Sequence, residues 1–308
     1  MTLRKVEIVT PVHNRREETL ICLRSISRSE STGLDVHVIV VDDGSTDGTA
    51  EAIRHEFPGV EIVQGNGNLW YTAGTNRGIE AALRHGPDYV IAINNDSIFD
   101  SKCVLRMVRC AESNPRSVVG ALLINREIPH TVFQVSPRWE TLRGGFRHWH
   151  RQTVWTVPEK PWDVEIVVGN CVLYPAEAIR EVGLMDEKHL VQYGDAEYTP
   201  RMRRRGWSLL IEPQARVFCK PNDPASGFRS LPIKKKFELI FRNPASPYCW
   251  QRRFYGTLGG APSLMQGLLA LPIFAARLFA GRNQEGTWAE TQPEPPLSAI
   301  FAAAVVDD

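Results

Sequence analysis

The residues best suited to chemistry in this chain lie in Asn94-Asn95-Asp96, directly after an apolar run at residues 89–93. The run suits a buried strand, and the carboxyl ends of parallel strands line the ligand crevice of open α/β sheets. One carboxylate there, with room for water and phosphate oxygens, suits Mg²⁺ or Mn²⁺ holding a diphosphate. We therefore expect Asp96 to bind a metal ion and Asn94 and Asn95 to lie beside a nucleotide.

A second acidic segment, Asp195-Ala196-Glu197, precedes a run rich in arginine. A carboxylate at a helix start is held by backbone N–H groups, and a carboxylate so held can take a proton from an attacking hydroxyl group. From the residues alone, the simpler interpretation is that Asp195 only caps the helix. Pro200 within the helical register favours a helix start near Thr199. Gly169 lies inside an expected strand at residues 164–174 and suggests close backbone approach to a ligand.

An acidic loop at residues 42–49 follows a continuous apolar strand. Its carboxylates can accept hydrogen bonds from the ring N–H of uracil or thymine and from a ribose hydroxyl. The same residues also form a turn in which Thr46 or Asp47 caps a helix, and the two interpretations are compatible. We expect Asp42 and Asp43 to contact a nucleotide.

A glycine-rich segment at residues 65–78 is the next unusual feature. Its glycines permit close approach to a ligand. Thr75 or Asn76 can begin a helix whose free N–H groups favour an anion, and Arg77 can add a charge-assisted contact to phosphate. Trp70 and its neighbour Tyr71 either pack against a base or sugar or belong to the core.

These segments need a scaffold, and strands alternating with short helices in the first half of the chain predict one. The pattern indicates parallel βαβ units in an α/β domain. The loops after the first two strands should then lie at the same sheet edge as Asp96. In the first of these loops, Asn14 can cap the following helix.

Composition limits the functions that are open to the chain. The 308 residues are 43% hydrophobic and 23% charged with a net charge of +1, which gives no global signal for nucleic acid. Six cysteines without a Cys-x-x-Cys pair argue against a zinc site or disulfide framework. No signal peptide is visible at the N-terminus, so we expect a cytoplasmic protein.

Four segments together resemble glycosyltransferase family 2, especially its bacterial rhamnosyltransferase-like members: residues 6–14, 40–49, 70–78 and 93–96. The similarity covers about residues 5–220. It implies the A-type glycosyltransferase fold, a Rossmann-like, mostly parallel sheet flanked by helices. It also implies inverting transfer of a sugar from a dTDP- or UDP-linked donor to a hydroxyl of a glycan or lipid-linked acceptor, in cell-surface polysaccharide synthesis.

The resemblance also assigns roles. It implies that Asp43 contacts the donor's base, that Asn94-Asn95-Asp96 is equivalent to the Asp-x-Asp metal motif, and that Asp195 is the catalytic base with Glu197 as an acidic partner. Because the first motif position is Asn94, one carboxylate instead of two should bind the ion more weakly. The residues expected around the donor are Pro11, Asn14, Asp42, Asp43, Gly74, Asn76, Arg77, Asn94 and Asn95.

We expect a nucleotide-sugar-binding half at residues 1–125, an acceptor-binding half at 126–220 and a helical C-terminal extension at 221–308. Residues 221–260 are candidates for a lid over the diphosphate. The apolar stretch 264–280 is short for spanning a bilayer. It either lies on the inner face of the membrane, helped by Lys234–Lys236 and Arg252-Arg253, or packs on the core or in a homodimer.

Two other functional classes fit parts of the pattern. A nicotinamide-dependent oxidoreductase shares the βαβ units, but no Gly-x-Gly-x-x-Gly follows the first strand. A non-catalytic nucleotide- or glycan-binding protein of the same fold would have Asp195 pointing away from the crevice. The transferase instead requires Asp96 and Asp195 to face one site.

Overall fold

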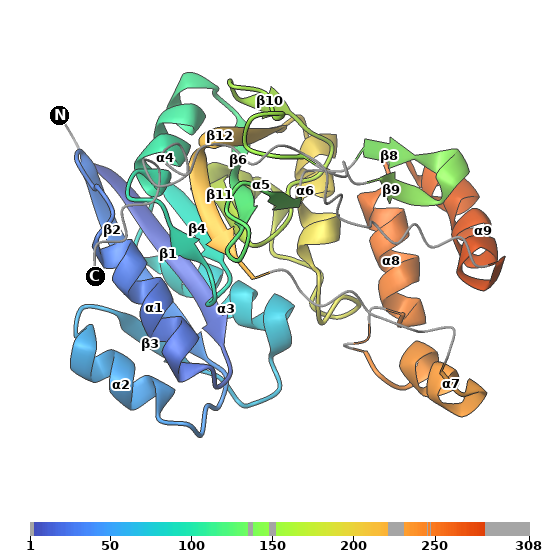
Figure 1. Cartoon of the computed structure of the whole chain (residues 1–308), viewed down its shortest axis with the longest axis horizontal. Helices are drawn as coiled ribbons and strands as arrows, with labels where there is room; N and C mark the ends of the chain where they lie inside the picture. Colours follow the sequence, from blue (N-terminus) through green and yellow to red (C-terminus); the bar gives the residue numbers. More distant parts are fainter. Residues whose placement is uncertain are drawn as a thin grey trace.

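The computed structural model describes residues 3–134, 138–147, 152–220, 231–244, 246 and 248–280. A large sheet forms its centre (Figure 1). From one edge to the other its strands are β10 (Trp162–Asp163), β12 (Ser208–Cys219), β6 (Ser117–Asn125), β11 (Cys171–Pro175), β4 (Tyr89–Ile93), β1 (Arg4–Val12), β2 (Leu34–Asp42) and β3 (Glu61–Gln64). Two short strands pair beside this path, β5 (Ile98–Phe99) with β12 and β7 (Val132–Gln134) with β6.

Most long strands of the sheet run parallel. β1 pairs in parallel with both β2 and β4, β2 with β3, and β6 with β12. β11 is the exception, because it lies antiparallel between β4 and β6. All nine residues of β6 are buried, as expected for a strand covered on both faces. The expected α/β sheet is therefore confirmed.

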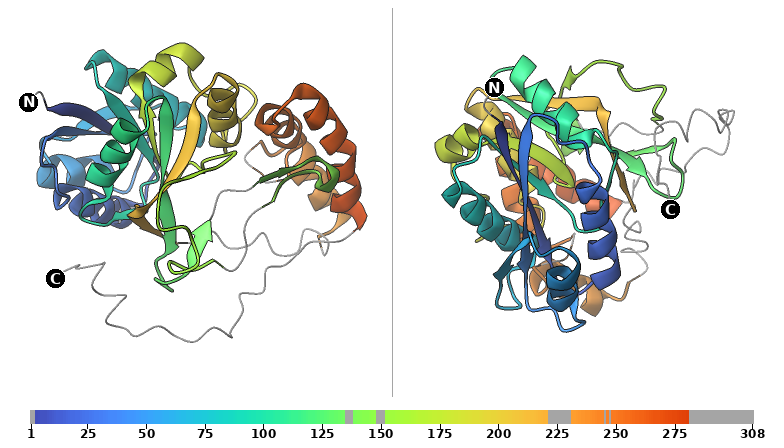
Figure 2. Two further views of the ribbon diagram at one scale, coloured as in Figure 1. Left: turned by 90° about the horizontal axis from the view of Figure 1, so that it is seen from above. Right: turned by 90° about the vertical axis from the view of Figure 1, so that its left-hand side faces the viewer.

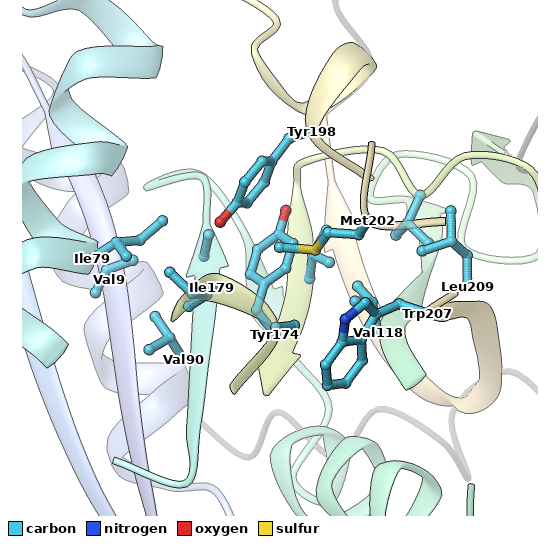
Figure 3. Packing of buried hydrophobic residues seen from close by; sticks show 14 of the residues in the cluster. Val9, Ile79, Val90, Val118, Tyr174, Ile179, Tyr198, Met202, Trp207 and Leu209 are labelled. Atoms are coloured by element: carbon cyan, nitrogen blue, oxygen red, sulfur yellow. The ribbon is translucent and has the colours of Figure 1, made fainter. Parts of the chain in front are cut away.

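Helices cover both faces of the sheet (Figure 2). Apolar side chains of α1 (Arg16–Ser27), α2 (Thr49–Glu56) and α4 (Cys103–Ser113) pack on one face. Those of α3 (Trp70–Arg84), α5 (Ala176–Val182) and α6 (Asp195–Arg204) pack on the other. In this second layer the rings of Tyr174 and Tyr198 lie 5.3 Å apart, which fixes α6 against β11 (Figure 3).

The described part of the C-terminal extension contains three helices, α7 (Ile233–Phe241), α8 (Trp250–Gly260) and α9 (Leu264–Ala280). α8 packs on α6, and α9 packs on α8. α9 also contacts a small hairpin of β8 (Arg138–Glu140) and β9 (Gly145–Arg147), joined through the short helix η1 (Thr141–Arg143) (Figure 1). No helix within the described residues is both long and apolar enough to cross a membrane. Residues 221–230 of the expected lid segment 221–260 lie outside the described residues, as does the tail from Asn283.

Two expected helix starts are wrong. Asn14 does not cap α1, because Arg15 is the N-cap and no side chain of that residue caps the helix. The backbone N–H of Arg16 instead donates to Asp47 of the next loop, at 3.0 Å. α3 begins at Trp70 and not at Thr75 or Asn76, so both of those residues lie inside the helix.

Two further local expectations are corrected around the acceptor half. We expected Pro200 to mark a helix start near Thr199, but α6 begins at Asp195 and contains Pro200. We also expected Gly169 inside a strand and close to a ligand. The strand begins only at Cys171, and the close approach at Gly169 is to Asp195 and Tyr71.

Candidate functional site

Asp96 lies just past the carboxyl end of β4, at the edge where ligands bind in such sheets. Its Oδ1 is buried and has no hydrogen-bond partner among the described residues. Its Oδ2 lies 3.3 Å from Nη1 of Arg15. A buried carboxylate oxygen without a partner is costly, so this atom favours a cationic ligand.

The surroundings of Asp96 fit a lightly held divalent ion. In the described part of the chain, no group of three or more His, Cys, Asp or Glu residues forms a metal cluster. A single carboxylate suits an ion that takes its other ligands from water and substrate phosphate oxygens. Asn95 is buried, and its Nδ2 donates to Thr19 at 3.0 Å, so this amide anchors the loop on α1.

Asp195 is the first residue of α6, and its side chain is buried. Its Oδ2 accepts a hydrogen bond from the backbone N–H of Gly169 at 2.9 Å. Burial raises the pKa of this carboxyl group, while the Gly169 N–H and the charge of Arg252 act in the opposite direction. A carboxylate with a raised pKa is a stronger proton acceptor, which suits a general base.

The turn at Gly169 and Asn170 joins the two acidic segments. Gly169 donates to Asp195, and the carbonyl of Asn170 accepts from the backbone N–H of Asn94 at 3.1 Å. The carbonyl of Gly169 accepts from the hydroxyl of Tyr71 at 3.0 Å, so α3 braces the same turn. Two adjacent residues therefore hold the segments of Asp96 and Asp195 side by side.

Arg252 of α8 adds a positive charge next to Asp195, and the only signal for it in the sequence is the basic pair Arg252-Arg253. Its guanidinium carbon lies 3.2 Å from the ring centroid of Tyr193, just before α6. Burial lowers the pKa of Arg252, and interactions with Tyr193 and Asp195 partly oppose this effect. Its Nη1 is buried without a hydrogen-bond partner among the described residues. A buried cation of this kind suits an anionic ligand.

Glu197 points to α8 and pairs with arginines of its own helix. Its Oε1 lies 2.9 Å from Nε of Arg201 and 3.9 Å from Nη2 of Arg204. A Cβ added to Gly259 would lie 2.2 Å from its Cγ, so the side chain fills the α6–α8 contact. Burial raises its pKa. This geometry makes Glu197 a packing residue of the interface, and a role in proton transfer stays a prediction.

The expected nucleotide loops are braced by their own acidic side chains. Asp43 accepts from the backbone N–H of Gly67 at 2.7 Å and of Leu69 at 2.8 Å. Asp42 accepts from the N–H of Ser45 at 2.9 Å. Each of the two carboxylates keeps at least one oxygen that can accept a further bond, so contacts to a base or ribose stay predictions.

Asn14 and the Pro11–Gly74 contact fix the same region. Oδ1 of Asn14 accepts from the backbone N–H of Thr46 at 2.9 Å, which ties the loops after β1 and β2 together. A Cβ on Gly74 would lie 2.7 Å from Cβ of Pro11. Only glycine at that position lets α3 approach β1 so closely. Contacts of these residues to a donor stay predictions.

Asn76 and Arg77 contact residues of this chain in the segment that precedes α6. The amide of Asn76 donates to the carbonyl of Met185 and accepts from its N–H, both at 3.0 Å. Arg77 pairs with Glu80 at 3.0 Å and with Glu187 at 3.8 Å. Since both residues lie inside α3, the helix start that would favour an anion is not at these residues. Their contact with phosphate stays a prediction.

Comparison with known proteins gives a consistent family. Residues 7–183, more than half of the chain, match the family described as Glycosyl transferase family 2. An N-acetylglucosaminyl-diphospho-decaprenol L-rhamnosyltransferase of Mycobacterium tuberculosis is 26% identical over 271 residues, which cover 79% of this chain and 86% of that protein. The dTDP-rhamnosyl transferase RfbF of Shigella flexneri is 21% identical over 179 residues, and the match covers 58% of each chain.

Solved structures share the arrangement of sheet and helices. The mannosyltransferase PcManGT from Pyrobaculum calidifontis, in complex with GDP-Man and Mn²⁺, has a TM-score of 0.51 at 18% identity and covers 96% of this chain and 78% of its own. GalNAc-T7 with UDP, GalNAc and Mn²⁺ has a TM-score of 0.59 at 14% identity, with 88% of this chain and 55% of that chain covered. The chain therefore belongs to glycosyl transferase family 2 and has the A-type glycosyltransferase fold.

Proposed function

We propose that this protein transfers a sugar from a nucleoside diphosphate sugar to an acceptor hydroxyl group, with Asp195 as the general base. The observation that supports this function is the Gly169–Asn170 turn, which holds Asp195 beside the segment of Asp96. One acid thus lies where an acceptor can be deprotonated, and the other where a diphosphate can be held.

The reaction is a single displacement. The acceptor oxygen forms a bond to the anomeric carbon as its proton passes to the carboxylate of Asp195. The bond from the anomeric carbon to the diphosphate oxygen breaks, and its electron pair leaves with the nucleoside diphosphate. Attack from the face opposite the leaving group inverts the anomeric configuration. The raised pKa of Asp195 favours its role as proton acceptor.

Positive groups around the leaving diphosphate stabilise its charge. The buried guanidinium of Arg252 lies close enough to Asp195 to act on the same substrate. Asp96, with its buried and unpartnered Oδ1, would hold Mg²⁺ or Mn²⁺. When bound, such an ion neutralises negative charge that develops on the leaving group.

The names of the relatives suggest the substrates. The mycobacterial relative is named for L-rhamnose transfer to a decaprenol-linked acceptor, and RfbF for a dTDP-linked donor. We therefore propose a dTDP- or UDP-linked donor and a glycan or lipid-linked acceptor in cell-surface polysaccharide synthesis. All six cysteines are buried thiols, as in proteins of a reducing cytoplasm.

Asp195→Asn tests the proposal. Because the amide cannot take the proton, kcat should fall by about 10²–10⁴-fold, while donor binding measured by calorimetry stays near that of the parent. Glu51→Gln, an exposed acid on α2, is the control and should leave both values unchanged. Near-normal turnover by Asp195→Asn would exclude Asp195 as the base. A parent protein that binds donors but transfers no sugar to any acceptor would support the non-catalytic binding function instead.

A further inference from the structure

Helix α7 is amphipathic and has no buried residue. Ile233, Phe237 and Phe241 recur every four residues, so they lie along one side of the helix. Their exposed fractions are 85%, 53% and 55%, and the two phenylalanine rings lie 4.8 Å apart. An apolar stripe of this kind is costly in water and marks a surface that is covered in use.

The charges of α7 are arranged around this stripe. Lys234 and Lys236 lie on the two sides of the apolar stripe, and their long side chains can extend outward along its edges. Lys235 lies on the opposite side and pairs with Glu238 at 3.0 Å. The helix therefore has an apolar stripe flanked by cations and an ion pair behind it.

The neighbouring helices continue the same character. Nine of the fifteen large apolar side chains that are exposed in the described part of the chain belong to α7, α8 and α9. Residues 231–280 contain seven Lys or Arg residues and one Glu. Two copies of so basic a segment repel each other, whereas the anionic surface of a bilayer attracts it.

We propose that α7 docks the protein on an anionic lipid surface. Ile233, Phe237 and Phe241 enter the boundary between headgroups and acyl chains, and Lys234 and Lys236 contact lipid phosphate groups. α7 lies at the periphery of the molecule, beyond α8 (Figure 1). This position leaves its apolar side accessible to a bilayer.

α7 directly precedes α8 in the chain, and α8 lies against the proposed catalytic site. α8 packs on α6, which begins at Asp195, and its Arg252 stacks on Tyr193. If the proposed function holds, an acceptor with a lipid tail can leave that tail in the bilayer beside α7 while its sugar reaches Asp195. This part of the inference rests on the proposed function, whereas the docking itself does not.

The test is co-sedimentation of the full chain with vesicles of phosphatidylcholine alone and of phosphatidylcholine mixed with phosphatidylglycerol. We expect binding only to the mixed vesicles, weakened by added salt. Phe237→Ser combined with Phe241→Ser should lower the partition coefficient about tenfold or more, because each ring loses its burial in lipid. Leu3→Ser is the matched control, because it removes an apolar side chain that is 57% exposed and lies just before β1, outside the C-terminal extension.

The lysines supply a second comparison. Lys234→Gln and Lys236→Gln should each weaken binding about fivefold, and Lys235→Gln on the opposite side should weaken it less. Equal binding to both kinds of vesicle, no binding, or an unchanged double phenylalanine variant would each overturn the proposal. So would sedimentation velocity showing dimers that the double variant abolishes, because the stripe would then bind a second copy.

Activity separates this proposal from the proposed function. The double phenylalanine variant should transfer sugar normally to a water-soluble acceptor and poorly to one embedded in vesicles. Asp195→Asn should bind vesicles as the parent does. A parent chain that transfers sugar to the soluble acceptor but does not bind the mixed vesicles refutes only the role of α7. A parent chain that binds the vesicles but has no transfer activity refutes only the enzymatic role.

Discussion

Replacing Gly169 with alanine should move Asp195 without removing it. The new Cβ would lie 2.5 Å from the hydroxyl of Tyr71 and 2.9 Å from Cβ and Cγ of Asp195. Ordinary contacts begin at 3.4 Å, so Asp195 must shift by about 0.5 Å. Since a misplacement of about 1 Å can cost about 10²-fold in rate, we expect kcat to fall about tenfold.

The pH profile distinguishes positioning from general damage. The Gly169 N–H lowers the pKa of Asp195 against the larger effect of burial, so a longer bond should raise that pKa further. The acid limb of kcat should then move to higher pH, because Asp195 must be deprotonated to act. Donor binding, measured by calorimetry, should stay unchanged.

Gly59→Ala is the matched control, because a Cβ at Gly59 meets no atom within 4 Å. It should leave kcat and the pH profile unchanged. A folded Gly169→Ala protein with parental kcat and an unmoved acid limb would refute the reasoning, since Asp195 would then tolerate displacement and need not be the base.

Three further predictions concern stability and the donor. Asp195→Asn should raise the melting temperature at neutral pH, because a carboxyl group whose pKa is raised by burial destabilises the folded state once it is charged. Melting curves recorded at decreasing pH should show this gain disappear below the usual Asp pKa of 3.8. Asp47→Ala should cost about 1–2 kcal/mol of unfolding free energy, because Asp47 accepts from the N–H groups of Arg16 and Thr49 at two helix starts. The hydroxyl of Thr49 chiefly lowers the pKa of Asp47, so denaturant titrations should show this cost shrinking as pH falls through that lowered pKa. Arg252→Gln should lower kcat/KM for the donor about 10–100-fold in steady-state assays, as expected when a charged hydrogen bond to the donor is lost. Arg253→Gln is the control, because Arg253 faces Phe274 of α9.

The parallel sheet and the acidic helix start were predictable because both leave local signals. Continuous apolar strands followed by polar loops indicate buried parallel pairing, and β2, which ends at Asp42 and is followed by Asp43, is an example. Asp195 also lies at a helix start, as its acidic segment indicates, although Pro200 favours a start near Thr199. In each case the residues that carry the signal lie within a few positions of the feature.

The starts of α1 and α3 were not predictable, because their partners come from distant loops. Asp43 accepts from the N–H groups of Leu69 and Trp70, and Trp70 takes a left-handed φ of 58°. The N–H of Arg16 is satisfied by Asp47. Local capping rules examine neighbours in sequence, so caps supplied across the fold leave no trace in the local pattern.

A helical extension was expected, and α9 coincides with the apolar stretch 264–280, but α7 and α8 were missed for a related reason. Residues 221–260 are rich in proline and charge, which suggested a lid, but α8 is stabilised by its packing on α6. Glu197 fills the space left by Gly259 at that contact. The role of Arg252 was missed with it, since only this packing turns a basic surface cluster into a charge beside Asp195.

The antiparallel strand β11 ties the two halves of the chain into one folding unit. It enters the sheet between β4 and β6, which are both complete by residue 125, but it belongs to the later half. During synthesis, the gap between these strands stays open until residue 175 has emerged, and open strand edges recruit other chains. The first half of the chain is therefore not an autonomous module, and exchanging it between relatives requires exchanging β11 and its Gly169–Asn170 turn as well.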